Sequence, residues 1–564
     1  MAAPIADVLL VGAGHIGGLL AKELASAGLK VIALERGPTA SLEDYAPRDS
    51  IRFITRGRLS DWVRHEPVMF RNTASERATA RYSNTPNNVL GGATLHWTGQ
   101  SARFHPNDFK VFSNEIATGV ADRAGADLTG YDVVDWPITY DDLEPYYTKF
   151  EWEFGIAGVG GGNPFAGPRS RDYPIPPLRI NAREQLFEAA AKRLGYHPYK
   201  SGAGILSEPY RPPAPFDTRI PERPACVYCG HCNGYGCHVN AKSAALYTVI
   251  PVALETGNVD LRTSCKVFRI NTDDAGRATG VRYFDAEGQV QEVNARVVIM
   301  AGYVFENSRL LLLSGPQGGR GLANSSGMVG RGMCAHGDVA IHGIFDDYII
   351  NSFIGPQAGG SRMDDFNGNN FDHTGVGFVR GAAMGAGGGG TPVERMDVVP
   401  PDMRAWGSDY KEYISRYYTR TMSMVITPET LAHNENLLDI DPDTRDAWGI
   451  PVPRLTFTFH QNERRMHEFM AKVGESIMRE TGASKVWSQL PGRGGTRWVG
   501  GTRMGSDPTK SVVNDLCQTH DVPNLFIVGA SVFPTLTAYP ATATISALCY
   551  RTTEHIIRQR EWFR

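Results

Sequence analysis

The amino-acid sequence predicts an α/β fold, α+β overall, in which a domain with a parallel sheet is interleaved with a domain built on an antiparallel sheet. Three observations predict it. A strand, a glycine-rich turn and a helix follow one another within residues 8–26. Two later apolar segments, 297–302 and 522–531, run into small residues and resemble further strands of the same sheet. Alternation of apolar and polar residues over 454–460 predicts a strand of the second sheet, forming the other wall of a pocket.

The composition is that of a globular protein with more than one core. The chain has 564 residues, more than a single hydrophobic core usually supports. A net charge of −3 gives no reason to expect a nucleic-acid partner. No apolar run approaches the roughly 20 residues of a membrane span. Because the first residues show neither a basic segment nor a cleavage site, we expect a cytoplasmic protein, exported only with a partner subunit.

The first 36 residues predict a Rossmann-type dinucleotide site. Strand 8–11 leads into Gly12, Gly14 and Gly17, which form the pattern G-x-G-x-x-G before a helix. The first glycine permits the tight turn, the second lets a pyrophosphate approach the backbone, and the third lets helix and strand pack closely. A second strand, 30–34, ends at Glu35, which can accept hydrogen bonds from ribose hydroxyls, with Arg36 beside it. The acid disfavours NADP, and this stretch alone leaves FAD and NAD open.

Three further stretches decide between these cofactors. Residues 88–109 read NVLGGATLHWTGQSARFHPNDF and contain Gly91, Gly92, His96 and Trp97; residues 135–147 read DWPITYDDLEPYY; residues 500–535 begin GGTRMGSDPTK. Together they resemble the glucose–methanol–choline (GMC) family of FAD oxidoreductases, in its gluconate and fructose dehydrogenase branch. The resemblance covers about residues 5–560 and is weakest over 340–430. It implies FAD as the cofactor and hydride transfer from an alcohol carbon to flavin N5.

The resemblance also assigns residues to the FAD site. Val267 is placed like the residue whose backbone meets the adenine, and the strand ending at Ala301 and Gly302 closes the FAD domain beside the adenosine. The strand that ends at residue 528 brings small residues against the cofactor. The further expected contacts are Gly529, Ala530 and Thr542. His96 is either bonded covalently to the flavin 8α-methyl carbon, as in several relatives, or only stacked near the flavin.

The expected domains follow from these anchors. They are 1–110, FAD-binding; 111–215, substrate or cap; 216–340, FAD-binding with a cysteine-rich loop at 226–237; 341–490, substrate domain; and 491–564, FAD-binding with the catalytic loops. The glycine-rich stretches 364–377 and 381–392 predict either a lid over the site or a flexible surface insertion. Apolar residues at helical spacing predict a packing helix over 463–480, and another helix is expected over 241–255.

At the catalytic positions the sequence departs from the family. Alcohol oxidation needs a base for the hydroxyl proton, and the family supplies a His before its GT-x-x-M segment and a His or Asn after the last strand. Here these positions fall on Arg497 or Trp498, and on Tyr539 or the proline after it. The base could therefore be His336 or a histidine of the weakly matching region, or the proton could pass to water or Tyr539, or the alignment is locally wrong. Arg497 could instead hold an anionic or polar substrate.

Four of the eight cysteines lie within twelve residues, in CVYCGHCNGYGC. Cys226, Cys229, Cys232 and Cys237 are spaced C-x2-C-x2-C-x4-C, which leaves an iron–sulfur cluster, zinc or a structural loop of free or paired thiols open. Family members carry a three-iron cluster in a comparable loop and pass electrons to a cytochrome subunit. Relative to them, the first and third of these cysteines match, the fourth is shifted by one and the second has no counterpart. The remaining cysteines, 265, 334, 517 and 549, are expected to be buried thiols.

The sequence thus predicts a GMC-type FAD-dependent alcohol dehydrogenase. Its expected substrate is a small polar alcohol such as a sugar, a polyol, a sugar acid or an aminoglycoside-like natural product. A cytochrome or small partner subunit is the expected electron acceptor. Two alternatives remain: an oxidase that passes its electrons to O2, like pyranose oxidase, and a non-catalytic flavoprotein subunit.

Overall fold

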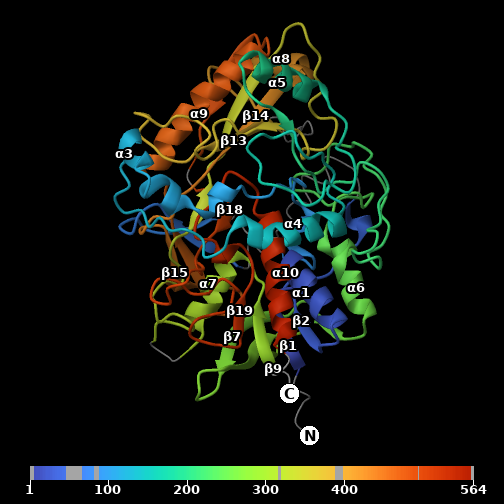
Figure 1. Ribbon diagram of the computed structural model, residues 1–564, viewed down its shortest axis with the longest axis vertical. Helices are drawn as coiled ribbons and strands as arrows, with labels where there is room; N and C mark the ends of the chain where they lie inside the picture. Colours follow the sequence, from blue (N-terminus) through green and yellow to red (C-terminus); the bar gives the residue numbers. More distant parts are fainter. Residues whose placement is uncertain are drawn as a thin grey trace.

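The computed structural model describes residues 6–45, 66–81, 88–315, 319–387, 398–492 and 494–559. The molecule is elongated, with a parallel sheet and its helices at the lower end of Figure 1 and an antiparallel sheet at the upper end. The helix α4 (Tyr140–Phe154) crosses the region between them. No helix in the described ranges is both long enough and apolar enough to cross a membrane.

The lower sheet has seven strands drawn from distant parts of the chain. Its parallel strands are β6 (Val259–Arg262), β2 (Val31–Leu34), β1 (Ala6–Val11), β9 (Val290–Met300) and β19 (Leu525–Ile527). The strands β8 (Ala278–Phe284) and β7 (Lys266–Thr272) extend it in antiparallel pairing. Val8, Leu9 and Leu10 of β1 are fully buried, as expected for a strand covered on both faces. The predicted interleaved Rossmann-type domain is confirmed.

Helices cover both faces of this sheet. The glycine turn leads into α1 (His15–Ser26), which packs against α6 (Val249–Glu255) and α10 (Thr542–Arg558); the remaining helix of this domain is α7 (Val304–Leu313). The stretch at 135–147 forms the start of α4, which packs on α10. Thr139 caps α4 by accepting a hydrogen bond from the Asp142 amide, and Gly155 ends it at φ +65°.

The upper sheet is antiparallel throughout and has six strands. Their order is β17 (Lys485–Gln489), β11 (Val339–Ile344), β14 (Thr421–Pro428), β13 (Ala382–Gly387), β12 (Ser361–Met363) and β5 (Tyr199–Lys200). The helices α5 (Ala182–Arg193) and α9 (Gln461–Glu480) cover one face, and α8 (Ser408–Tyr417) packs at its edge. Met363, Met384 and Met424 point into that helical layer. Alternate residues of these strands therefore face the parallel-sheet domain.

A smaller sheet of four strands corrects one expectation. It contains β15 (Leu437–Arg445), β16 (Pro451–Thr456), β3 (Val68–Arg71) and β4 (Thr79–Arg81). The alternating segment 454–460 was expected in the substrate-domain sheet, but only its first residues are in a strand, β16, and that strand pairs with β3 and β15. Alternation specifies a half-buried strand without specifying its partner, so the predicted strand is right and its predicted sheet is wrong.

The remaining elements are short. The strands β10 (Cys334–His336) and β18 (Thr496–Val499) form a separate antiparallel pair. The short helices are η1 (Leu42–Tyr45), η3 (Gly92–Leu95), η4 (Pro106–Phe109), η5 (Phe112–Ile116), α3 (Val120–Ala124), η6 (Ala245–Tyr247), η7 (Tyr418–Arg420) and η8 (Ala530–Val532). The predicted helix 463–480 is present as α9, whereas 241–255 forms only η6 and α6.

The glycine-rich stretches behave differently from one another. Asp364, Asn367 and His373 are buried, so 364–377 is a packed connection and not a surface insertion. Residues 382–387 form β13, and 388–392 lie outside the described residues. The domain boundaries stay predictions, although β3 and β4, from the first expected FAD segment, join a sheet with β15 and β16.

Candidate active site

The glycine turn after β1 is packed so tightly that side chains cannot replace two of its glycines. Gly12 has φ +98°, and a Cβ on it would lie 3.0 Å from the Ala301 carbonyl oxygen. A Cβ on Gly17 would lie 2.0 Å from the Gly12 oxygen. The N-terminus of α1 follows at once, so its free amides and positive dipole end face this turn. These features fit a bound pyrophosphate.

Glu35 joins the ends of the first two parallel strands. Its two carboxylate oxygens accept hydrogen bonds from the Ala13 and Gly37 amides, each at 2.8 Å. Burial raises the pKa of Glu35, and the two amides oppose that rise. The neighbouring Arg36 is directed elsewhere. Its guanidinium forms an ion pair with Glu66 and donates to the Asn88 side chain at 2.5 Å.

The second glycine pair lies on top of the first turn. The Gly91 amide donates to the Ala13 oxygen at 3.0 Å, and a Cβ on Gly92 would lie 2.9 Å from the Gly14 Cα. Gly92 has φ +59°, a conformation that glycine adopts without strain. Two segments separated by about eighty residues therefore form one surface at the carboxyl edge of the parallel sheet.

The other expected FAD contacts come to the same edge. The Ala301 amide donates to the Val11 oxygen at 2.9 Å, which places Gly302 beside the first turn. The Val528 amide donates to the Met300 oxygen at 2.9 Å, which places Gly529 and Ala530 next to that strand end.

Two positions complete this edge. The Cys265 amide donates to the Glu35 backbone oxygen at 2.8 Å, and Val267 follows two residues after Cys265. Thr542 begins α10, whose Ser546 hydroxyl bonds the His15 ring at 2.8 Å and so joins the starts of α10 and α1. The sequence predicted this gathering, while the contact of each residue with FAD stays a prediction.

The cysteine-rich loop is attached to the expected flavin segment. The Gly234 amide donates to the His96 oxygen at 2.7 Å. The buried Lys242 ammonium donates to the oxygens of Trp97 at 2.9 Å, Cys232 at 2.8 Å and Tyr235 at 2.6 Å. The buried Lys242 ammonium thus joins two backbone oxygens of the loop to the backbone oxygen of Trp97. These contacts hold the loop against His96 and Trp97.

The four thiols of this loop are free and unequal in exposure. Cys229 is exposed and Cys232 is buried, and burial raises the pKa of Cys226 to about 11 and that of Cys232 to about 12. Within the described residues, the one trio of potential ligands gathered within 4.8 Å lies elsewhere, at His433, Glu435 and His460. No three of these sulfur atoms therefore lie within 4.8 Å of one another, and metal binding by them stays a prediction. The four other cysteines are buried, as expected.

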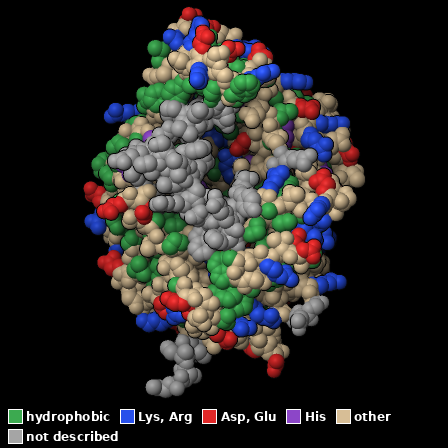
Figure 2. Space-filling view, turned by 180° about the vertical axis from the view of Figure 1, so that it is seen from behind, with side chains coloured by type: hydrophobic (Ala, Val, Ile, Leu, Met, Phe, Trp, Pro, Cys, Tyr) green, Lys and Arg blue, Asp and Glu red, His purple; other side chains and the backbone are tan. Residues whose placement is uncertain are grey.

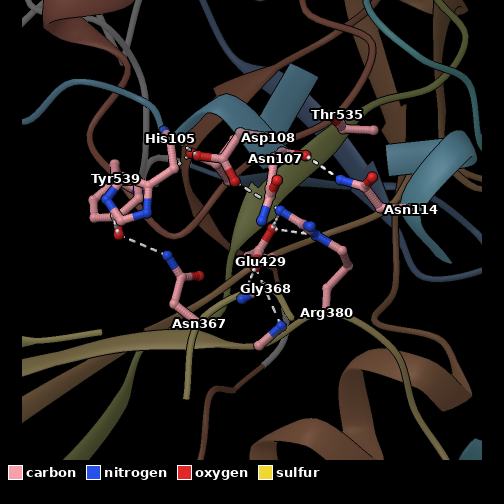
Figure 3. Close-up of polar contacts among 12 residues, drawn as sticks. His105, Asn107, Asp108, Asn114, Asn367, Gly368, Arg380, Glu429, Thr535 and Tyr539 are labelled. Atoms are coloured by element: carbon pink, nitrogen blue, oxygen red, sulfur yellow. Dashed lines mark hydrogen bonds and ion pairs between the residues drawn. The ribbon is translucent and has the colours of Figure 1, made fainter. Parts of the chain in front are cut away.

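Tyr539 lies in a buried polar group that Figure 3 shows in close-up. Its hydroxyl is 3.0 Å from His105 Nε2 and accepts a hydrogen bond from Asn367 Nδ2 at 2.6 Å. The Asp364 carboxylate lies 3.6 Å from the same histidine nitrogen. Burial raises the pKa of Tyr539 far above its usual value, so the phenol stays protonated at neutral pH. A cavity of ≈ 70 Å³, bordered by His105, Tyr199 and Tyr539, adjoins the group.

His336 and Arg497 form a second polar group. His336 Nε2 lies 2.6 Å from the Thr537 oxygen, which can only accept, so this nitrogen carries the hydrogen. Nδ1 then accepts from Arg497 Nη1 at 3.4 Å, and Arg497 also pairs with Asp338 at 2.8 Å. Burial and then the Arg497 charge lower the pKa of His336 to about 4. The Tyr539 amide donates to the Thr537 hydroxyl at 3.3 Å, so the two groups are neighbours.

Trp498 points the other way. It is buried among Phe305 and Phe457, whose ring centroids are 5.4 Å and 4.7 Å from its own. Successive residues of β18 face opposite sides, so Arg497 and Trp498 cannot both reach one site. Of the expected catalytic residues, the structure brings His336, Arg497 and Tyr539 into one region and places Trp498 in a hydrophobic core.

A fully buried arginine, Arg380, lies in the same region as Tyr539. Arg380 donates to Glu429 at 2.7 Å and to Asp108 at 2.7 Å (Figure 3). It also donates to Glu115 at 3.1 Å. It has φ +66°, and three carboxylates hold it in this uncommon conformation. Burial, partly offset by Arg380, raises the pKa of Glu429 to about 7.

Arg380 and its three carboxylate partners, together called the Arg380 group, position the residues around Tyr539. Asp108 Oδ2 accepts the His105 amide at 2.8 Å, and Glu429 Oε1 accepts the Gly368 amide at 3.0 Å, next to Asn367. The loops that carry the two hydrogen-bond partners of Tyr539 are therefore attached to the same buried ion-pair group.

Known proteins match this chain along almost its whole length. Family models described as GMC oxidoreductase match residues 216–338 and 433–549. The gluconate 2-dehydrogenase flavoprotein of Pantoea cypripedii is 33% identical, over 98% of this chain and 94% of that protein. The chain belongs to the GMC oxidoreductase family.

Other members of the GMC family are more distant. The fructose dehydrogenase large subunit of Gluconobacter japonicus is 27% identical, with 98% of both chains covered. The crystal structure of pyridoxine 4-oxidase from Mesorbium loti covers 98% of this chain and 99% of its own, with a TM-score of 0.61 and 17% identity, and so shares the fold. The predicted family, the predicted fold class and the predicted enzyme class, a GMC-type oxidoreductase acting on CH–OH groups, are confirmed.

Sequence reasoning missed three residues of this GMC site. His105 lies in the quoted stretch 88–109, nine residues after His96. The polar residues of FHPND were a signal that could have pointed to it as a site residue. Asn367 and Arg380 lie in the region of weakest resemblance, and only tertiary contacts connect them with Tyr539.

Proposed function

We propose that this GMC oxidoreductase is an FAD-dependent dehydrogenase that oxidises a CH–OH group of a small polar molecule. Sugars, polyols, sugar acids and aminoglycoside-like compounds are the candidate substrates, in keeping with relatives named for gluconate, fructose and 2-methyl-1,2-propanediol. The observation that carries the proposal is the buried Tyr539–His105–Asn367 group, which can accept an alcohol proton.

FAD would be held by the residues gathered at the carboxyl edge of the parallel sheet. They are Gly12, Gly14, Gly17, Glu35, Gly91, Gly92, Val267, Ala301, Gly302, Gly529, Ala530 and Thr542. When bound, FAD supplies the acceptor for the hydride that leaves the alcohol carbon. The fit rests on the glycine turns, where a Cβ on Gly12, Gly17 or Gly92 would press against backbone atoms.

The hydrogen bonds of Tyr539 suggest the path of the hydroxyl proton. Its oxygen accepts from Asn367, and its own hydrogen can be donated to His105 Nε2, which leaves one lone pair for the substrate hydroxyl. The proton then moves from substrate to the Tyr539 oxygen while the phenol hydrogen moves to His105. The imidazolium formed there would be stabilised by Asp364, 3.6 Å away.

His336 is a weaker candidate for the base. Its pKa of about 4 leaves it neutral at pH 7, and its Nδ1 lone pair already accepts from Arg497. His336 and Arg497 are better suited to orient a substrate hydroxyl or another polar group.

The test of this proposal is anaerobic reduction of the flavin. The purified holoenzyme is mixed under argon with sugars, polyols and sugar acids, and flavin absorbance is followed in a stopped-flow instrument. We expect at least one of these alcohols to bleach the flavin. Failure of every alcohol to do so would support the non-catalytic alternative. Rapid reoxidation in air would favour an oxidase, as in the relative named paromamine 6'-oxidase of Streptomyces fradiae.

We further propose that His96 is the attachment point of a covalent flavin and that Cys226, Cys229, Cys232 and Cys237 hold a second redox centre. The loop's contact with the His96 oxygen supports a shared function. A cytochrome or small partner subunit would then receive the electrons, as the relative named a large subunit suggests. Acid precipitation that leaves all flavin in solution would exclude the bond to His96. Metal analysis and an EPR spectrum test the cluster.

A further inference from the structure

Arg362, in the middle of β12, is a buried cation for which the described part of the chain offers no hydrogen bond or ion pair. Its relative exposure is 6%, and its Nε and Nη2 atoms are shielded from solvent without a hydrogen bond. Other buried arginines of the described chain, such as Arg103, Arg309 and Arg380, each donate to carboxylates. A buried charge without a partner is strongly unfavourable, so this side chain requires a group that the described residues do not supply.

The direction of Arg362 follows from its neighbours in β12. Met363 packs in the helical layer of α5 and α9, and the Ser361 hydroxyl bonds Glu188 of α5. Since successive side chains of a strand alternate, Arg362 points to the opposite face, toward the parallel-sheet domain. Gly385, opposite it on β13, makes room, because a Cβ there would lie 3.0 Å from Arg362 Cγ.

This face of the sheet borders the candidate active site. Ala383, two residues from Gly385 on β13, packs in the same hydrophobic cluster as Tyr539. Tyr199, which pairs with Arg362 across β5, borders the same cavity as Tyr539. The Arg362 charge also reaches His336, whose pKa it helps to lower. On the side seen in Figure 2, the molecule is hollowed, and basic and acidic side chains are visible inside the hollow.

We propose that Arg362 binds a carboxylate of the substrate, which makes the substrate a hydroxy acid. Nε and Nη2 form one edge of the guanidinium, and their parallel N–H groups match the two oxygens of a carboxylate. One cation balances one negative charge, which favours a carboxylate over a doubly charged phosphate. This inference rests on the proposed alcohol oxidation and narrows its substrate class.

The experiment compares a sugar acid with the polyol of the same carbon chain. An aldonate and its alditol differ only in carrying a carboxylate or a hydroxymethyl group at one end. In anaerobic flavin reduction by the wild-type holoenzyme, we expect the apparent second-order rate constant for the aldonate to exceed that for the alditol about 100-fold. Arg362→Gln should remove this preference, so that the constants for aldonate and alditol become nearly equal. Arg416→Gln, an exposed position on α8, is the matched control and should keep the preference.

Calorimetric titration of the oxidised holoenzyme with glutarate gives a readout without turnover. Wild type should bind this dicarboxylate, and Arg362→Gln should bind it at least about 50-fold more weakly. An aldonate preference that survives Arg362→Gln, or equal rates for both substrates in wild type, would overturn the inference while alcohol oxidation stands. If neither substrate reduces the flavin but glutarate binding still depends on Arg362, the proposed function fails and the carboxylate site stands. Loss of flavin from Arg362→Gln would instead assign Arg362 to FAD and overturn the inference.

Discussion

The resemblance places the histidine or asparagine of the family pattern at Tyr539 or the proline after it, and the hydrogen bonds of Tyr539 can compensate for the change. A phenol alone is a poor base at neutral pH, but His105 next to its oxygen provides an acceptor for its hydrogen. In the proposed mechanism, Tyr539 and His105 together accept the proton that a single side chain accepts in the family pattern. His105 comes from a different part of the sequence.

Replacing Tyr539 by Phe should slow flavin reduction by about 100-fold or more, because the proton path is broken. The flavin content should not change. Tyr146→Phe is the control, since that hydroxyl donates to the Glu554 side chain on α10 and not to the group around His105. Stopped-flow anaerobic reduction with the best alcohol measures both. Equal rates in the two variants would contradict the role of Tyr539.

Gly92 offers a test of the cofactor cradle at a single carbon atom. Gly92→Ala places a Cβ 2.9 Å from the Gly14 Cα at φ +59°, so we expect purified protein with most of its FAD lost. Gly257→Ala has the same type of backbone, φ +68°, but nothing within 4 Å of the new carbon. The ratio of flavin to protein absorbance compares the two. If both variants keep their flavin, the glycine contact is not needed for binding.

At the scale of elements, the Arg380 group shows how loops far apart in sequence are held in register. It connects η4, η5 and the end of β14 through a guanidinium and three carboxylates. Such a cluster of buried ion pairs specifies one arrangement of the loops, because any other arrangement leaves buried carboxylates without a partner.

Arg380→Met should lower the free energy of unfolding by about 3–5 kcal/mol, because three buried carboxylates lose their counter-ion. Arg479→Met on α9 removes an exposed ion pair with Glu475 and should cost about 0.5 kcal/mol or less. Urea denaturation of both variants gives the comparison. A small effect for Arg380→Met would show that the carboxylates are protonated or solvated without it.

Prediction from sequence succeeded where the signal was local. The glycine turn, the apolar strands and α9 carry their pattern within a few residues, so their type and approximate bounds followed directly. The sheet of strand β16 did not follow, because alternation says nothing about partners. His105 and Arg362 were missed for a related reason. Their roles depend on which chain segments lie across the site, and no local pattern records that.

At the scale of the whole molecule, buried histidines make stability depend on pH. Burial lowers the pKa of His15 to about 3 and that of His467 to about 4, as for His336. In the unfolded chain each takes up a proton near pH 6.5, so the unfolded state binds more protons below that pH. Their stabilising contribution is therefore complete above pH 6.5 and is lost as pH falls toward 4.

We expect the free energy of unfolding to fall by several kcal/mol between pH 7 and pH 5, at about 1.4 kcal/mol per pH unit for each histidine. Glu429, whose pKa is raised to about 7, opposes this trend because its folded form gains a proton first. Urea titrations at several pH values measure the slope. In His467→Gln the slope should fall by about 1.4 kcal/mol per pH unit, and an unchanged slope would exclude His467 as a contributor.

The parallel sheet places β1, β9 and β19 side by side, although they come from the beginning, middle and end of the chain. During synthesis on the ribosome, β9 therefore waits for its neighbour β19 until nearly all of the protein has been made. The expected FAD site lies at the edge of these three strands, so it should be complete only after the chain is released. Loss of the segment after residue 500 would remove β19 and α10, so it should prevent cofactor binding by the entire protein.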